Sequence, residues 1–182
     1  MATNKYSFEL KSDLSELKTL SNHINNFGQA NGLKEILISE INICLDELFT
    51  NIVLYGFKDD LEHIIRFNLN KNGNALILNI EDNGIPFNPL LKKNSELPAD
   101  INNAKIGGLG IHIVKKLMDD IWYERKPGKN RLTLKKSVHA PSHLYKSDKA
   151  SNIPSNYIRW TNEVWEKVEG STNDSTIWWF LP

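Results

Sequence analysis

The chain has 182 residues, of which 40% are hydrophobic and 24% are charged. This length suits one domain with an appendage, and the apolar share excludes disorder throughout. The 22 basic side chains balance the 22 acidic ones, so no general field attracts nucleic acid or an anionic membrane. Because no run of 18 apolar residues and no basic-then-apolar leader occurs, we expect a cytoplasmic protein that binds neither membrane nor nucleic acid directly.

The first half of the chain predicts a strand, two helices and a hairpin. Polar and apolar residues alternate from 5 to 11, as in a half-buried strand, and apolar residues then recur at helical spacing over 14–28 and 34–57. Cys44, the single cysteine, falls in the second helical pattern, and we expect it to be buried packing. Residues 64–69 and 75–80 indicate strands joined by an Asn-Gly turn.

The second half predicts a long loop, a helix and another hairpin. Residues 85–105 contain three prolines and several asparagines, and loops of that length are usually lids or disordered segments. A helix is expected over 109–118, followed by strands over 121–125 and 131–135. This order favours an α+β fold, a two-layer sandwich with a mixed, mostly antiparallel sheet and helices on one face.

The composition changes after residue 136. Residues 137–156 are rich in Ser, Asn, Pro and Lys, which is typical of a linker, and four of the five tryptophans follow it. We therefore expect a domain over 1–136, a linker over 137–156 and an aromatic-rich appendage over 157–182. The appendage should dock on its own domain, on a second copy of the chain or on a partner.

Three motifs carry the candidate chemistry. Glu47 and Asn51 are four residues apart on the long helix, so a carboxylate and an amide leave the same face one turn apart. The Asp-Asn-Gly motif at 82–84 ends a strand, where a carboxylate can accept a hydrogen bond and a glycine lets a flat ligand approach. The Gly-Gly-Leu-Gly motif at 107–110 precedes a helix, whose free N–H groups favour a phosphate. Each motif alone is also typical of an ordinary surface or turn.

In this order the motifs resemble the nucleotide-binding fold of the GHKL superfamily, which includes gyrase, histidine kinases and Hsp90-type ATPases. The segments 45–51, 81–89 and 107–119 look like those of the bacterial anti-sigma-factor serine/threonine kinases, and 123–134 resembles that family's closing hairpin. The resemblance covers about residues 5–136 and implies the Bergerat-type ATP-binding fold, with ATP and Mg²⁺ as cofactors.

The resemblance also implies a role for each motif. Glu47 would be the general base, and Asn51 would ligate a Mg²⁺ that bridges the phosphates. Asp82 would accept a hydrogen bond from the adenine amino group, and Gly84 would give the base room. Residues 87–106 would form a lid over ATP. The phosphate side of the site would comprise Lys105, Gly108, Leu109 and Gly110.

One departure from the family pattern concerns charge near the phosphates. In related kinases a Lys or His often follows the metal-binding asparagine by three or four positions, but here those positions hold Leu54 and Tyr55. Lys105 could supply the missing charge. His112 is expected to be a packed or surface histidine and not a phosphate ligand.

The implied function is a protein serine/threonine kinase that phosphorylates a STAS-type antagonist and sequesters a sigma factor, acting as a homodimer. An alternative is a nucleotide-sensing binding module with weak or no kinase activity, which Leu54, Tyr55 and the aromatic tail favour. A third reading, the catalytic part of a histidine kinase, is disfavoured because no phosphoacceptor-histidine helix and no membrane segment precedes the motifs.

Overall fold

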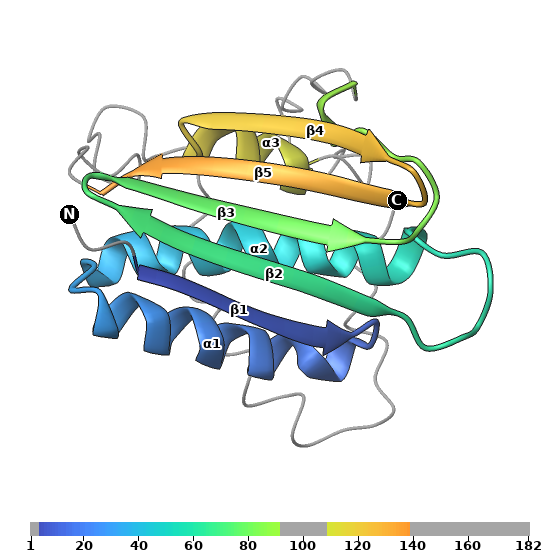
Figure 1. Cartoon of the computed structure of the whole chain (residues 1–182), viewed down its shortest axis with the longest axis horizontal. Coiled ribbons are helices and arrows are strands. Elements are labelled where there is room, and N and C mark those ends of the chain that lie inside the picture. The colour runs from blue at the N-terminus through green and yellow to red at the C-terminus, as the bar shows by residue number, and fades with distance from the viewer. Residues whose placement is uncertain (1–3, 92–108, 139–182) are drawn as a thin grey trace, which may run out of the picture.

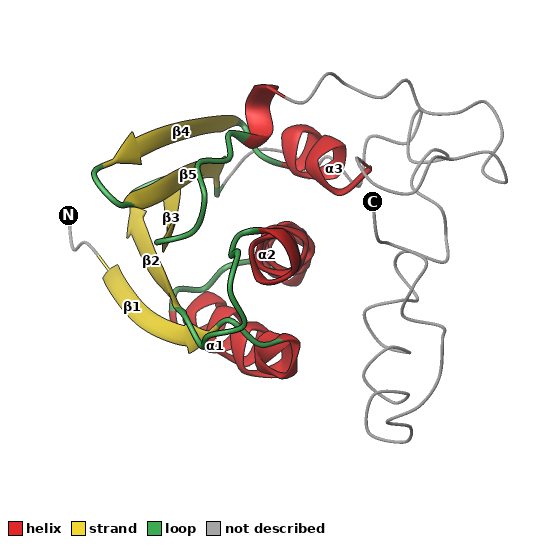
Figure 2. Cartoon of the chain, turned by 90° about the vertical axis from the view of Figure 1, so that its right-hand side faces the viewer, coloured by secondary structure: helices red, strands yellow, loops and turns green. Residues whose placement is uncertain are grey.

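The computed structural model describes residues 4–91 and 109–138 (Figure 1). These residues form a five-stranded sheet whose one face is covered by helices, as the end-on view in Figure 2 shows. The α+β two-layer fold that the sequence predicts is therefore confirmed. Most of the expected lid, nearly all of the expected linker and the whole aromatic-rich appendage lie outside the described residues.

The elements follow the predicted chain order. The first half contains β1 (Asn4–Lys11), the 3-10 turn η1 (Leu14–Glu16), α1 (Leu17–Ala30), α2 (Glu35–Tyr55), β2 (Ile64–Asn72) and β3 (Ala75–Asp82). The second half contains the 3-10 turn η2 (Pro89–Leu91), α3 (Leu109–Leu117), β4 (Asp120–Lys126) and β5 (Lys129–Ser137).

Local chemistry explains the element ends, including one difference from prediction. Asp13 Oδ1 accepts a hydrogen bond from the Ser15 amide at 2.8 Å, and this cap starts a 3-10 turn in place of the α-helix expected from residue 14. Gly73 and Gly128 have φ of 56° and 71°, the left-handed conformation that glycine adopts readily in hairpin turns.

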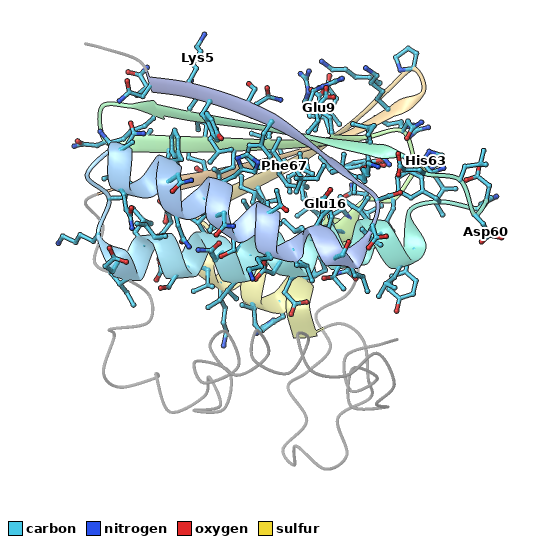
Figure 3. All side chains as sticks on the ribbon, turned by 90° about the horizontal axis from the view of Figure 1, so that it is seen from below. Lys5, Glu9, Glu16, Asp60, His63 and Phe67 are labelled. Atoms are coloured by element: carbon cyan, nitrogen blue, oxygen red, sulfur yellow. The ribbon has the colours of Figure 1, made fainter. Side chains whose placement is uncertain are left out.

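The sheet has the strand order β1-β2-β3-β5-β4, and all four pairings between described strands are antiparallel. Alternate residues face the helices, so Leu69, Leu78 and Leu134 lie side by side across β2, β3 and β5 and are buried. Figure 3 shows Phe67 between the sheet and the helices, with Glu9 on the opposite, polar face.

The middle helix of the layer is α2, which lies between α1 and α3 in Figure 2. It packs closely on α1, because a Cβ at Gly28 would lie 2.6 Å from Cδ1 of Ile38. Cys44 in α2 is fully buried, as expected, and this burial raises the pKa of its thiol. Within the described ranges, no helix is both long enough and apolar enough to span a bilayer.

Candidate functional site

Asp82, the last residue of β3, lies at one end of the candidate site. Its side chain is buried at 7% exposure, and Oδ1 accepts hydrogen bonds from the Gly84 amide at 2.8 Å and Asn130 Nδ2 at 2.7 Å. Burial raises the pKa of Asp82, while these two hydrogen bonds and the charge of Arg125 oppose the rise. Because both hydrogen bonds end on Oδ1, Oδ2 is the acceptor that remains for a ligand.

Asn130, which the sequence analysis did not select, holds Asp82 in place. It faces Asp82 directly across β3 and β5, and its Nδ2 also donates to the Ile85 carbonyl at 2.9 Å. Its Oδ1 accepts hydrogen bonds from the Tyr123 hydroxyl and from Arg125 Nη1, both at 2.8 Å. All four hydrogen-bonding positions of this buried amide are thus used, which fixes its orientation.

Arg125, also missed, ties this network to the turn after β3. Its Nη1 donates to the Gly84 carbonyl at 2.9 Å as well as to Asn130. The signal that could have found Asn130 is the alternation of β5, which puts position 130 on the same face as Leu132 and Leu134. A polar residue on that buried face needs a partner, and Asp82 is that partner.

Gly84 fits a close approach between the turn after β3 and the end of α2. A Cβ built on Gly84 would collide with the Gly56 carbonyl oxygen and lie 2.8 Å from Asp82 Oδ1. The neighbouring Ile85 amide donates to the same Gly56 carbonyl at 2.7 Å. The close packing of protein on Gly84 explains the glycine here, and its expected contact with a base stays a prediction.

Glu47 and Asn51 on α2 form the other end of the site. Asn51 Nδ2 donates to the Glu47 carbonyl at 2.5 Å, so Oδ1 is the atom of this amide that remains for a metal. A Cβ at Gly110 would overlap Oε2 of Glu47 and lie 2.8 Å from its Cδ. The structure therefore brings the first turn of α3 directly against the Glu47 carboxylate.

The remaining predicted residues are described only in part. Lys105 and Gly108 lie outside the described residues, and Leu109 is known only as the first residue of α3. Leu54 and Tyr55 in the last turn of α2 are 37% and 40% exposed, so they present uncharged surface there. His112, expected to be a packed or surface histidine, is half-buried, and burial lowers the pKa of its ring.

Asp46, next to Glu47, is a further acidic group that the sequence analysis did not select. Its Oδ1 is buried and accepts no hydrogen bond from the described residues. Burial and then the charge of Glu47 raise the pKa of Asp46 to about 7. A second carboxyl, which is neutral below about pH 7 and charged above it, thus lies next to the candidate base along α2.

The donor set of the site suits a magnesium ion held mainly by phosphate. Among the described residues, no three His, Cys, Asp or Glu side chains cluster to hold a metal by themselves. Mg²⁺ bound with a nucleotide takes one or two oxygen ligands from the protein and keeps phosphate and water oxygens around it. A single amide oxygen, that of Asn51, fits this requirement.

An antiparallel sheet under three helices, with this polar site at the ends of α2, β3 and α3, is the architecture of a GHKL-type ATP-binding domain. The family profile of the histidine kinase-like ATPase domain matches residues 10–136. The chain belongs to this family.

Among curated relatives, the serine/threonine-protein kinase BtrW of Bordetella bronchiseptica is 30% identical over 94 residues, which cover 52% of this chain and 66% of the relative. The serine-protein kinase RsbW of Bacillus mycoides is 35% identical over 89 residues, which cover 46% and 54%. The chain thus matches between half and two thirds of the length of these relatives.

A solved structure supports the fold alone. The RsbU and RsbW domains of a Mycobacterium tuberculosis protein superpose with a TM-score of 0.52 at 14% sequence identity, covering 76% of this chain and 34% of that one.

Proposed function

We propose that this chain is an ATP-dependent protein serine/threonine kinase of the anti-sigma-factor type. It transfers the γ-phosphate of ATP to a Ser or Thr of a STAS-type antagonist and sequesters a sigma factor, as a homodimer in the cytoplasm. The observation that carries the proposal is the contact between the Glu47 carboxylate and the first turn of α3 at Gly110. The relatives' names, serine/threonine-protein kinase for BtrW and serine-protein kinase for RsbW, support the same reaction.

At the Asp82 end, the protein supplies a fixed acceptor for the adenine amino group. Asn130 and the Gly84 amide hold Oδ1, so the ligand meets Oδ2 without competing for those donors. A nucleobase with an amino group at this position is preferred over one with a carbonyl, because the carbonyl would face the carboxylate with no hydrogen between them.

At the Glu47 end, the protein aligns the nucleophile. Glu47 accepts the proton of the attacking Ser or Thr hydroxyl, and the backbone N–H groups at the start of α3 hold the phosphates. Asn51 would hold Mg²⁺ through Oδ1, and the ion would neutralise charge on the transferring phosphoryl group. The hydrogen bond from Asn51 Nδ2 to the Glu47 carbonyl keeps that oxygen oriented.

A second candidate function is a nucleotide-sensing module that binds ATP and transfers no phosphate. The exposed Leu54 and Tyr55 favour it, because they leave the last turn of α2 without a cation near the phosphates.

Calorimetry with Mg²⁺-ATP, followed by phosphotransfer assays with labelled ATP, separates the two. Any small STAS-type protein encoded beside this gene serves as the phosphoacceptor in these assays. The kinase predicts transfer that Glu47→Ala lowers by about 10² to 10⁴-fold while ATP binding is kept. Glu35→Ala, which removes an exposed acid from the first turn of the same helix, is the matched control. Binding without transfer, at stoichiometric protein, would leave the sensing module.

A further inference from the structure

A buried ion pair joins three elements of the core away from the atoms that would contact a nucleotide. Glu40 of α2 and Lys136 of β5 are 0% and 1% exposed, and Nζ lies 3.0 Å from Oε2. The same Nζ donates a hydrogen bond of 2.5 Å to the carbonyl of Leu117, the last residue of α3. Because helix C-terminal carbonyls carry partial negative charge, the ammonium is held from two sides.

The acidic partner of this pair lies on the same face of α2 as the candidate catalytic residues. Glu40, Cys44, Glu47 and Asn51 are spaced by four, three and four residues, so they form one stripe along the helix. Glu47 in this stripe contacts the start of α3 at Gly110, and Glu40 is linked through Lys136 to the end of α3.

The two connections are matched in spacing. Seven residues separate Glu40 from Glu47 on α2, and seven separate Gly110 from Leu117 on α3. At 1.5 Å per residue, each interval is about 10 Å. The helix α3 is therefore held against α2 at both of its ends, and any slide that opens one connection also shifts the other.

Stability alone gives little reason for such a pair. Removing two charges from water is costly, and apolar residues of similar volume are often as stable or more so. What an ion pair can add is a unique alignment, because its short, directed contacts fit one arrangement of the elements that they join.

We propose that Glu40 and Lys136 are positioning residues that fix the place of α3 along α2, and thereby set its phosphate-binding first turn against Glu47. They act through the Leu117 carbonyl and contact no ligand. The inference rests on the proposed nucleotide site, in which the phosphates meet the start of α3 while the adenine is held at Asp82.

The test compares two ligands that use the two ends of the site differently. Mg²⁺-ATP needs the start of α3, whereas adenosine has no phosphate and needs only the Asp82 end. In the full chain, Glu40→Leu/Lys136→Met should keep the Tm at or above that of the wild type. Its affinity for Mg²⁺-ATP, by calorimetry, should fall at least about tenfold. Its affinity for adenosine, by nuclear magnetic resonance titration, should stay within about twofold, which a general loss of structure would not produce.

The matched control removes a neighbouring ion pair that does not involve α2. Lys135 Nζ lies 3.0 Å from Asp120 Oδ2 at the surface, and Asp120→Leu/Lys135→Met should leave the ratio of the two affinities unchanged.

A second variant keeps the test decisive if the double variant does not fold. Glu40→Asp retains the charge but shortens the side chain. To keep the ion pair, Lys136 and the end of α3 that it holds must therefore move toward α2. The ratio of ATP to adenosine affinity should fall at least about threefold. An unchanged ratio in a folded variant overturns the positioning role alone. A wild-type chain that binds no Mg²⁺-ATP removes the proposed function, and this inference with it.

Discussion

The two ends of the candidate site are built in different ways. At the Asp82 end, the amide of Asn130 in β5 uses all of its hydrogen-bonding positions. It joins β5 to Asp82 of β3, to Arg125 of β4 and to the turn after β3 at Ile85. At the Glu47 end, the alignment depends on how two helices pack, with Gly110 leaving just enough room for a carboxylate. Hydrogen bonds therefore organise the proposed adenine acceptor before a ligand binds, whereas the proposed catalytic alignment can shift whenever α3 shifts.

The largest effect is expected where α3 meets Glu47. In Gly110→Ala, the new Cβ would overlap Oε2 of Glu47, so the carboxylate or the helix must move. Since a misplacement of about 1 Å can lower a rate by about 10²-fold, phosphotransfer to an antagonist should fall by about that factor in single-turnover assays. Lys116→Ala, at an exposed position of the same helix, should transfer phosphate at the wild-type rate. Equal rates for both variants would mean that the contact with Glu47 has no catalytic role.

The next effect is a pH dependence of stability at the same end. The raised pKa of Asp46, about 7 against 3.8, means that the folded state holds a proton which the unfolded state has released. The stabilisation that neutral Asp46 gives to the folded state is fully present below about pH 4, and it is lost as the pH rises through about 7. Between pH 5 and pH 8 the wild type should therefore lose about 2 to 3 kcal/mol more than Asp46→Asn does. Urea denaturation at the two pH values measures this difference, and parallel losses would contradict the assignment.

At the Asp82 end, the expected effects are similar or smaller and concern affinity. Asp82→Asn can place an N–H where an acceptor is needed, and Asn130→Ala removes a donor that holds Asp82 Oδ1. Each variant should weaken Mg²⁺-ATP binding by about 1 to 3 kcal/mol in calorimetry. Thr133→Ala on the opposite face of β5 is the control. Should Asn130→Ala bind as tightly as the wild type, Asp82 would not need its support.

The smallest effect is expected beside this network, on the polar face of the sheet. Arg131 follows Asn130 but faces away from the helices, and its Nη2 lies 2.6 Å from Glu81 Oε1. Because both charges are partly exposed, Arg131→Met should change the free energy of unfolding by less than about 1 kcal/mol and leave ATP affinity unchanged. A large loss of ATP affinity would extend the candidate site to the polar face.

Sequence periodicity predicted the order and type of the described helices and strands, because each is long enough to show its buried face. The first hairpin turn followed from the pair Asn72-Gly73. The family resemblance implied that Glu47 and Gly110 belong to one site, and their direct contact is seen only in the structure. The roles of the site residues toward ATP and Mg²⁺ stay predictions.

What could not be predicted depends on contacts between distant segments. Asn130 looks like a turn residue until the register of β5 places it opposite Asp82, 48 residues earlier in the chain. Glu40 and Lys136 look like surface charges, and only the packing of α2, β5 and α3 shows that both are buried. Asp46 looks like an ordinary helical acid in the sequence, and only the structure shows the burial that, with the charge of Glu47, raises its pKa.

The strand β5 carries two buried polar side chains on its helix-facing side, the amide of Asn130 and the ammonium of Lys136. Asn130 supports Asp82, and Lys136, six residues further on, holds Glu40 and the end of α3. Both side chains therefore depend on the same inward and outward alternation along the strand. Inserting one residue between the β4–β5 turn and Asn130, with the turn kept in place, would rotate both outward at once and bring Arg131 and Lys135 into the core. Inserting two would restore the faces and displace only the partners, so length changes in this strand should be tolerated in even steps before odd ones.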